Sequence, residues 1–583
     1  MIDQEDRFRV RTGKARRSSA GSRHPQKFVS EILRAANRSG RVGGLTRSAR
    51  SGSNFGRGRA AALGMNRHAA ARRVIIKTRI VRNGNAPPGA LSQHISYLER
   101  DGVTRDGQDA ALFDAGGDDA DRDGFAERCE EDRHHFRFMV SPEDAAEMED
   151  LRGFTRELMA DMERDLDTRL DWQAVDHWNT DNPHIHILVR GRDDIGNDLI
   201  ISKDYISHGM RGRAEERVSL ELGPRSEREI NADLKAQVTA ERWTKLDQVL
   251  QREANDGDGI VNLRTSHGNR GDNFHRSLIG RAQHLEKMEL AFPRSSGRWS
   301  LHPNMETTLR DLGIRGDIVK TMHRAMKEGG RRPNVSSFSI GERVADKPVL
   351  GKFIARGLHD ELTGEAYAIV DGVDGKNHYL RFGDISVTSD AGPGAIVESR
   401  QWTDARGRTS QALAVRSDFD LEAQIKAGGA TWIDRQLLAN KADGLGGGFG
   451  NKVRDAMEKR IDHLAGEGLA KRQGRRVTFA RNLIATLRNR EFKNIAARIE
   501  QETGIRHLPS AAGDYLTGTY TKRLQLASGR FAMIESISEG GKSFELVPWR
   551  PALEEQLHKS VQGLMMAGGR VDWNLGRQKG LSR

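Results

Sequence analysis

The most informative segment of this chain is the run His177-Trp178-Asn179-Thr180-Asp181-Asn182-Pro183-His184-Ile185-His186. Side chains alternate between the two faces of a β-strand, so His184 and His186 are expected to project to the same side. His177 ends the preceding strand, and the turn through Asn182-Pro183 can bring it opposite the pair. Three neutral imidazoles on adjacent strands are a good site for a divalent first-row metal.

Other metal chemistries fit these residues less well. A nucleobase deaminase needs Pro-Cys-x-x-Cys, and Cys129 is the only cysteine. The helical His-Glu-x-x-His motif is absent, and no glutamate follows the pair in Ile187-Leu188-Val189-Arg190-Gly191, where a cupin-type dioxygenase would carry one. A structural histidine pair on a strand is the simple alternative, although three histidines in ten residues are harder to explain in that way.

Outward from this run, strand and helix patterns alternate. Strands are expected at residues 73–81, 135–140, 172–177 and 184–189. Helices are expected at 91–100 and at 141–166, the second with Ser141 as its cap, and the acidic residues 104–132 are expected to form a surface loop. One face of the second helix is apolar, with Met148, Leu151, Phe154, Leu158 and Met162. This order predicts an α+β domain with a central antiparallel sheet that ends near residue 255.

The chain has six tyrosines, of which Tyr97 and Tyr205 are the two in the N-terminal half. Leu91, Ile95 and Leu98 define the buried face of helix 91–100. Tyr97 lies about 100° around the helix from Leu98. It can therefore line a cleft as a nucleophile, or lie half-buried at the rim of the core.

The C-terminal half contains an internal repeat with an offset of 177 to 179 residues. One copy contains Arg281-Ala282-Gln283-His284-Leu285, Leu290-Ala291, Gly297-Arg298 and Thr308-Leu309-Arg310. The other contains Arg460-Ile461-Asp462-His463-Leu464, Leu469-Ala470, Gly474-Arg475 and Thr486-Leu487-Arg488. Each copy predicts a helix, a short β-hairpin and a helix, the order around the wing of a DNA-binding winged-helix module. A generic helix–hairpin packing unit is the alternative. Residues 348–400, between the copies, predict a small barrel or sheet.

The net charge of +12 is unevenly distributed. Residues 1–73 hold 18 Lys and Arg against four acids, so the remaining 510 residues carry a net charge of −2. A basic tail suits phosphate backbones, although a solvated extension or an organelle transit peptide has the same composition. No run approaches the roughly 18 apolar residues of a membrane helix. With a single cysteine, the sequence predicts a cytoplasmic protein without membrane insertion.

Residues from about 73 to 230 resemble the relaxases of conjugative and mobilisable elements, in the branch often called MOB-P. The resemblance is carried by four segments: Tyr97-Leu98-Glu99-Arg100-Asp101-Gly102, His135 with its strand, His177 with His184-Ile185-His186, and Leu222-Gly223-Pro224-Arg225-Ser226-Glu227. The long C-terminal half resembles the poorly characterised domain that often follows this nuclease domain.

The resemblance implies an HUH-type nuclease, with a palm-like sheet that binds single-stranded DNA and one divalent cation, Mg²⁺ or Mn²⁺. His177, His184 and His186 would hold the cation and Tyr97 would be the nucleophile. Asp181 matches the acid of the family's histidine loop, which would orient a histidine or help to activate the tyrosine. Some relatives have a further histidine where this chain has Asn182. Contributions from His135 and Tyr205 stay open.

The expected activity is site-specific nicking and rejoining of one DNA strand at a transfer origin, through a 5′-phosphotyrosine. The expected partners are single-stranded DNA at that origin, a coupling protein and accessory relaxosome proteins. A rolling-circle replication initiator or a transposase would share the chemistry. A DNA-binding regulator built on the repeat, with structural histidines, would have no enzymatic activity.

These patterns divide the chain into five parts. They are a basic tail (1–72), a relaxase domain (73–255), a winged-helix-like segment (256–345), a β-rich segment (346–420), and a second winged-helix-like segment with the C-terminal region (421–583).

Overall fold

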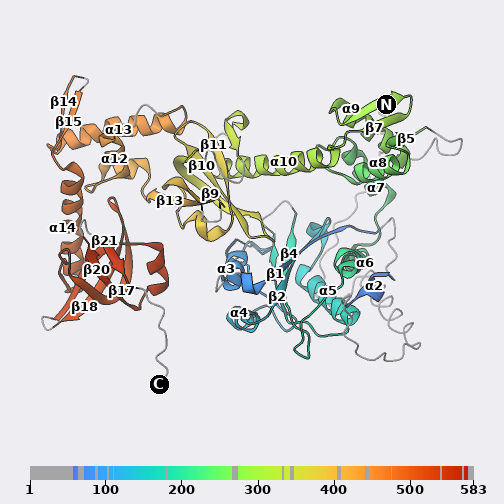
Figure 1. The fold of residues 1–583 in the computed structure, drawn as a ribbon, viewed down its shortest axis with the longest axis horizontal. Coiled ribbons are helices and arrows are strands. Elements are labelled where there is room, and N and C mark those ends of the chain that lie inside the picture. The colour runs from blue at the N-terminus through green and yellow to red at the C-terminus, as the bar shows by residue number, and fades with distance from the viewer. Residues whose placement is uncertain are drawn as a thin grey trace, which may run out of the picture. The chain divides into compact units, whose positions relative to one another are not determined.

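The computed structural model describes residues 57–63, 71–85, 90–101, 104–108, 110–178, 182–264, 273–330, 334–341, 347–403, 407, 409–439, 445–474, 476–538, 541–566 and 570–574. Their contacts divide the chain into two compact units, Met1–Thr239 with Thr265–Arg281, and Ala240–Arg264 with Ala282–Arg583. Helices and mostly antiparallel strands build both units, which confirms the expected α+β class at this level (Figure 1). No helix in these ranges combines the length and apolar character needed to cross a bilayer.

The first unit is built on a four-stranded antiparallel sheet with the strand order β1-β2-β4-β3. Its strands are β1 (Val74–Arg82), β2 (His134–Pro142), β3 (Trp172–His177) and β4 (His184–Arg190). All four lie where the sequence predicts strands. Every residue of β3 is buried, so this edge strand of the sheet is covered on both faces.

Helices cover both faces of this sheet (Figure 1). They are α3 (Ala90–Asp101), α4 (Arg122–Glu130), α5 (Leu151–Leu166) and α6 (Met210–Leu222). On one face, Phe138 and Ile187 pack in the core formed with α5 and α6. On the other face, Leu188 packs with Leu98 of α3 in a smaller core that α4 completes. Because strand side chains alternate, odd-numbered residues of β2 and even-numbered residues of β4 share this second face.

Two sequence predictions for this unit are wrong. The segment 104–132 is not all loop, because α4 begins after Asp121, whose carboxylate caps the helix. The helix expected from Ser141 begins ten residues later, where Asp150 caps α5. Ser141 instead belongs to β2 and pairs with Ile75 of β1, so strand pairing overrides the local Ser-Pro helix-start signal. The predicted apolar face, from Met148 to Met162, is confirmed, since all five of its side chains are buried.

Shorter elements complete the first unit. They are α2 (Arg59–Leu63), the 3-10 turns Asn83–Asn85 and Ala145–Glu147, the π-helical turn Tyr205–Gly209, and α7 (Glu227–Val238). Helix α9 (Asn273–Lys287) begins in this unit.

The second unit contains two six-stranded sheets. The first has the order β13-β12-β9-β10-β11-β8 and the second the order β16-β19-β18-β17-β20-β21. The first is formed by β8 (Phe338–Ile340), β9 (Leu350–Asp360), β10 (Glu365–Gly372), β11 (Asn377–Phe382), β12 (Ile396–Thr403) and β13 (Thr409–Ser417). The second is formed by β16 (Arg506–His507), β17 (Tyr515–Leu526), β18 (Gly529–Ser538), β19 (Gly541–Pro548), β20 (Ser560–Met566) and β21 (Arg570–Trp573). The first sheet lies where the sequence predicts a small sheet between the repeats.

The internal repeat forms helix, hairpin and helix twice, as the sequence predicts. Copy one contains α9, β6 (Ala291–Ser295), β7 (Arg298–Leu301) and α10 (Met305–Glu328), with β5 (Ile260–Asn262) as a third strand paired to β7. Copy two contains α13 (Phe449–Gly466), β14 (Ala470–Gln473), β15 (Arg476–Phe479) and α14 (Leu483–Thr503). The short helix α11 (Leu421–Lys426) precedes copy two.

The repeat extends further upstream than the sequence pattern indicates. Each copy has an additional helix that starts with a buried Thr-x-x-Asp capping box: α8 (Lys245–Asp256) after Thr244, and α12 (Trp432–Leu438) after Thr431. The arginine that opens each sequence repeat, Arg281 or Arg460, is fully buried. In copy two, Arg460 forms an ion pair with the capping carboxylate of Asp434.

Candidate metal centre

The three predicted metal ligands come together on β3 and β4. His177 and His184 are directly opposite each other in the antiparallel register, and His186 is two residues further along β4. All three are buried, with 3 to 6% of their surface exposed. One ring nitrogen from each histidine lies within 4.8 Å of the others. The sequence prediction that these residues share one face is therefore confirmed.

Hydrogen bonds orient two of the three rings. His177 donates through Nε2 to the backbone oxygen of Leu98, at 2.9 Å. His184 donates through Nδ1 to the backbone oxygen of Asn182, at 3.0 Å. A carbonyl only accepts, so each bond fixes one N–H and leaves the other ring nitrogen with a lone pair. Metal-binding histidines typically use their second nitrogen in this way.

The spacing of the remaining nitrogens also fits a metal ion. Nε2 of His184 lies 3.1 Å from Nε2 of His186. Two nitrogens that bind one ion at about 2.1 Å lie roughly 3.0 to 3.4 Å apart. The cluster can therefore hold a metal ion.

Tyr97 lies on α3, next to the residue that holds the histidine cluster. The carbonyl that His177 contacts belongs to Leu98, so the backbone of α3 touches the cluster one residue beyond Tyr97. Leu98 and Ile95 are buried, Leu91 is partly buried, and Tyr97 is half-buried. The predicted buried face of α3 is confirmed, and the helix positions Tyr97 at the edge of this core.

The other candidate residues do not join the cluster. Tyr205 is fully buried on the opposite face of the sheet, where its hydroxyl donates to Asp165 at 3.0 Å and burial raises its pKa. His135 bonds Asn83 at 2.7 Å through Nδ1 and accepts from Arg137 at 3.0 Å through Nε2. Both ring nitrogens of His135 are thus engaged outside the metal cluster. Asp181 lies outside the described residues.

A row of basic side chains shares the face of the metal cluster. Lys77 of β1 pairs with Met139 of β2, which pairs with His186. In the next row, Arg79 pairs with Arg137, two residues along β2 from Met139. Directly opposed residues lie on the same side of a sheet. Lys77 is exposed and Arg79 is half-buried.

Sequence reasoning did not single out these cations. Their signal is the spacing of Lys77 and Arg79, two residues apart in a strand whose other face carries the core residues Val74 and Ile76. Hydrogen bonds to Asn83 and Arg137 satisfy both ring nitrogens of His135, which makes its burial in the strand favourable. Burial, and next the adjacent Arg137, lowers the pKa of His135 to about 3. The ring therefore stays neutral, and its Nε2 can accept the hydrogen bond that Arg137 donates.

Comparison with known protein families finds a match for the C-terminal half of the chain. A family model described as "Protein of unknown function (DUF3363)" matches residues 278–410 and 399–582, more than half of the chain. The chain belongs to the DUF3363 family. This agrees with the uncharacterised domain expected after the nuclease domain, whereas Tyr97 and the three histidines lie outside the match. No curated protein and no solved structure matches this DUF3363 chain.

Proposed function

We propose that this protein is a metal-dependent DNA relaxase that nicks and rejoins one strand at a transfer origin. The observation that carries the proposal is the contact between His177 and the Leu98 carbonyl, which joins the three-histidine cluster to the helix of Tyr97. A structural histidine pair would not require a third imidazole, nor a tyrosine-bearing helix against it.

His177, His184 and His186 would hold the cation. A bound cation would polarise a phosphodiester and stabilise the charge that develops on its oxygens. This role is supported by the pairing of β3 with β4, which brings the three rings together, and by the carbonyls of Leu98 and Asn182, which orient two of them. Burial of the cluster limits access of bulk water, which strengthens electrostatic interactions at the site.

Tyr97 would be the nucleophile. Its hydroxyl oxygen forms a bond to phosphorus while the bond from phosphorus to the 3′-oxygen breaks, the phenolic proton passes to a base, and the 3′-oxygen takes up a proton. The products are a 5′-phosphotyrosine and a free 3′-hydroxyl. Because one phosphoester replaces another, the step is reversible and the strand can be rejoined. Asp181 remains our proposed acid for orienting a histidine or helping to activate Tyr97.

The basic row would bind the strand. Lys77 and Arg79 lie on the same face as the metal cluster, at the edge strand β1. Cations that contact phosphates give affinity that does not depend on sequence. Arg137 lies in the same row, where its Nε donates to His135 and His135 in turn contacts Asn83.

The repeated helix–hairpin–helix modules would bind duplex DNA in the manner of winged helices. The third strand on the copy-one hairpin, in the order β5-β7-β6, supports this proposal. The coupling protein and relaxosome proteins would act on the same complex. A replication initiator or transposase with the same chemistry would differ in its target DNA and in the fate of the joined strand.

The test uses labelled single-stranded oligonucleotides that contain transfer origins from different mobile elements, with Mn²⁺ or Mg²⁺, on a denaturing gel. We expect a site-specific nick with protein linked to the 5′-phosphate of the downstream fragment, lost with EDTA and in Tyr97→Phe. Tyr515→Phe is the matched control, because Tyr515 is 84% exposed in the second unit. DNA binding without an adduct at any origin would contradict the proposal and favour the non-enzymatic regulator.

A further inference from the structure

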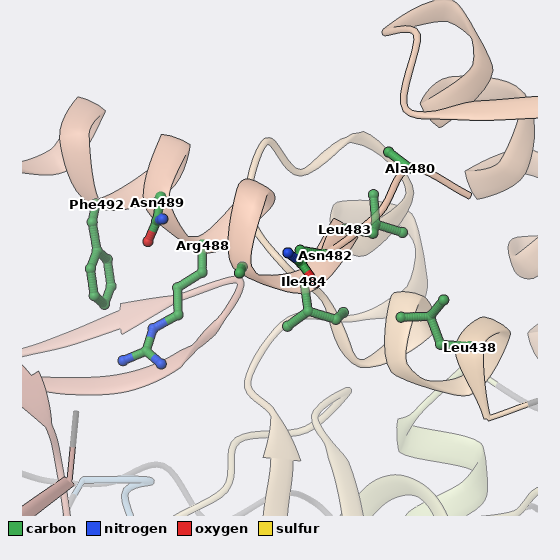
Figure 2. Close-up of a pocket in the computed structure, with 9 residues that line it drawn as sticks. Leu438, Ala480, Asn482, Leu483, Ile484, Arg488, Asn489 and Phe492 are labelled. Carbon is green, nitrogen blue, oxygen red and sulfur yellow. The ribbon is translucent and has the colours of Figure 1, made fainter. Parts of the chain in front are cut away.

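A cavity of about 600 Å³ lies in copy two of the repeat, between the end of α12 and the first three turns of α14 (Figure 2). Leu438 lines it from α12, and Ile484, Arg488 and Phe492 line it from α14. These three α14 residues are four apart, so they lie on one face of the helix, and Figure 2 shows them extending to the same side. The volume is within the range of small-molecule sites.

The charged group of the cavity is Arg488. Its guanidinium carbon lies 5.0 Å from the ring centre of Phe492 and 5.6 Å from that of Phe531. The two rings hold it by cation–π contacts. Among the described residues, no carboxylate lies within ion-pair distance of Arg488, and burial lowers its pKa. The wall of the cavity therefore carries a cation that an anionic ligand could pair with.

In copy one, the arginine at the equivalent position forms an ion pair with a glutamate. Arg310 corresponds to Arg488 in the repeat and bonds Glu306 through Nε and Nη2, at 2.9 and 2.7 Å. The counterpart of Glu306 in copy two is Ile484. The next acid of copy one, Asp311, is replaced by Asn489, which also lines the cavity. Copy two therefore keeps the arginine and lacks both acids beside it.

The remaining groups describe the ligand. Leu438 and Ile484 offer apolar surface, and Asn482 and Asn489 offer amides that can donate and accept hydrogen bonds. Asn482 begins α14 without a side-chain cap, in the left-handed conformation at φ +60°. A ligand with an anionic group, a flat apolar body and polar edges fits this set.

We propose that this cavity binds a nucleotide, with its phosphate on Arg488 and its base and sugar against Leu438 and Ile484. The nucleotide is either free in solution or one unit of a DNA strand. This site is separate from the metal centre and does not depend on nicking. It gives the DUF3363 part of the chain a ligand-binding role of its own.

The test titrates the full-length protein with deoxyadenosine monophosphate by calorimetry in EDTA, so that the metal centre takes no part. Ile484→Glu rebuilds the acid of copy one, and Arg488→Gln removes the charge. Each should weaken binding about tenfold or more, as expected for a lost charge-assisted hydrogen bond. Arg310→Gln is the matched control in copy one and should bind as the natural protein does. Asn489→Asp adds an acid at an exposed position, so it tests the charge argument even if Ile484→Glu does not fold.

A second arm distinguishes the two sources of nucleotide. Single-stranded oligonucleotides that carry 5-iodouracil are photo-cross-linked to the protein, and the linked peptides are identified by mass spectrometry. Cross-links to α14 that disappear in Ile484→Glu, with no binding of the free nucleotide, support a DNA strand as the source. Absence of both free-nucleotide binding and α14 cross-links overturns the proposal. Tyr97→Phe should give the natural result in both arms, so failure of the relaxase chemistry would leave this site intact.

Discussion

Replacement of Arg460 by methionine should strongly destabilise the second repeat module. The Arg460 guanidinium is fully buried and donates to both carboxylate oxygens of Asp434, at 2.8 and 2.9 Å. It also donates to the backbone oxygens of Ile425, Ala427 and Gly429, at 3.1, 2.7 and 3.0 Å. Methionine has a similar length and fills the space, but it leaves the Asp434 charge and three carbonyls without this donor.

The expected loss is about 4 kcal/mol, because breaking a buried ion pair by removing one partner costs about 3–5 kcal/mol. That is a large part of the 5–15 kcal/mol typical of a folded domain. With a urea dependence of about 2 kcal/mol per molar, the unfolding midpoint would fall by about 2 M. The double variant Arg460→Met with Asp434→Leu also removes the unpaired Asp434 carboxylate, so it should regain part of the lost stability.

The assay is hydrogen exchange of peptides from α12 and α13 at increasing urea concentration, which reports on this module alone. Arg472→Met is the control, because Arg472 forms ion pairs with Glu458 and Asp462 at the surface. Exposed pairs contribute about 0–1 kcal/mol. A loss below about 1 kcal/mol in Arg460→Met would refute the reasoning, because the buried pair would then contribute no more than the exposed one.

Three further predictions concern the first unit. Its stability should fall as the pH drops from about 6.5 towards 4, because the unfolded chain protonates His135 near pH 6.5 whereas burial lowers the pKa of His135 in the folded state to about 3. The free energy of unfolding, measured in urea at several pH values, should depend less on pH in His135→Gln, by up to about 1.4 kcal/mol per pH unit. An unchanged pH dependence would contradict the buried neutral ring. His186→Ala should weaken Mn²⁺ binding about 100-fold in calorimetry, while His135→Gln should retain it, and equal affinities would argue against the three-histidine site. Cys129 should resist iodoacetamide in the native protein, because burial raises its pKa to about 12; rapid alkylation would show that α3 and α4 do not pack as described.

Local pattern predicted the elements around the site well. Each strand of the first sheet has its own alternation or β-branched run. The connection between β3 and β4 is short, which favours their antiparallel pairing, and in the register that forms His177 lies opposite His184. The apolar face of α5 and the buried face of α3 follow from helical periodicity. These features depend on residues near one another in the chain.

Features that depend on distant pairing were missed. Ser141-Pro142 has the composition of a helix start, but pairing with β1 keeps it in β2. The basic row on the metal face requires the register of three strands, which no local window contains. The same holds for the partner of Arg460, since Asp434 precedes it by 26 residues. The repeat pattern located the arginine, but its burial and its partner emerge only from the packing of α12 on α13.

The most direct test of the central claim is to identify the residue that becomes linked to DNA. The full-length protein is incubated with Mn²⁺ and a single-stranded origin oligonucleotide. Its upstream product, which carries the free 3′-hydroxyl, is too short to stay bound, so the adduct accumulates. After digestion, mass spectrometry locates the nucleotide-bearing residue. The account predicts a 5′-phosphate linked to Tyr97. Linkage to any other residue, or cleavage without a covalent adduct, would contradict it.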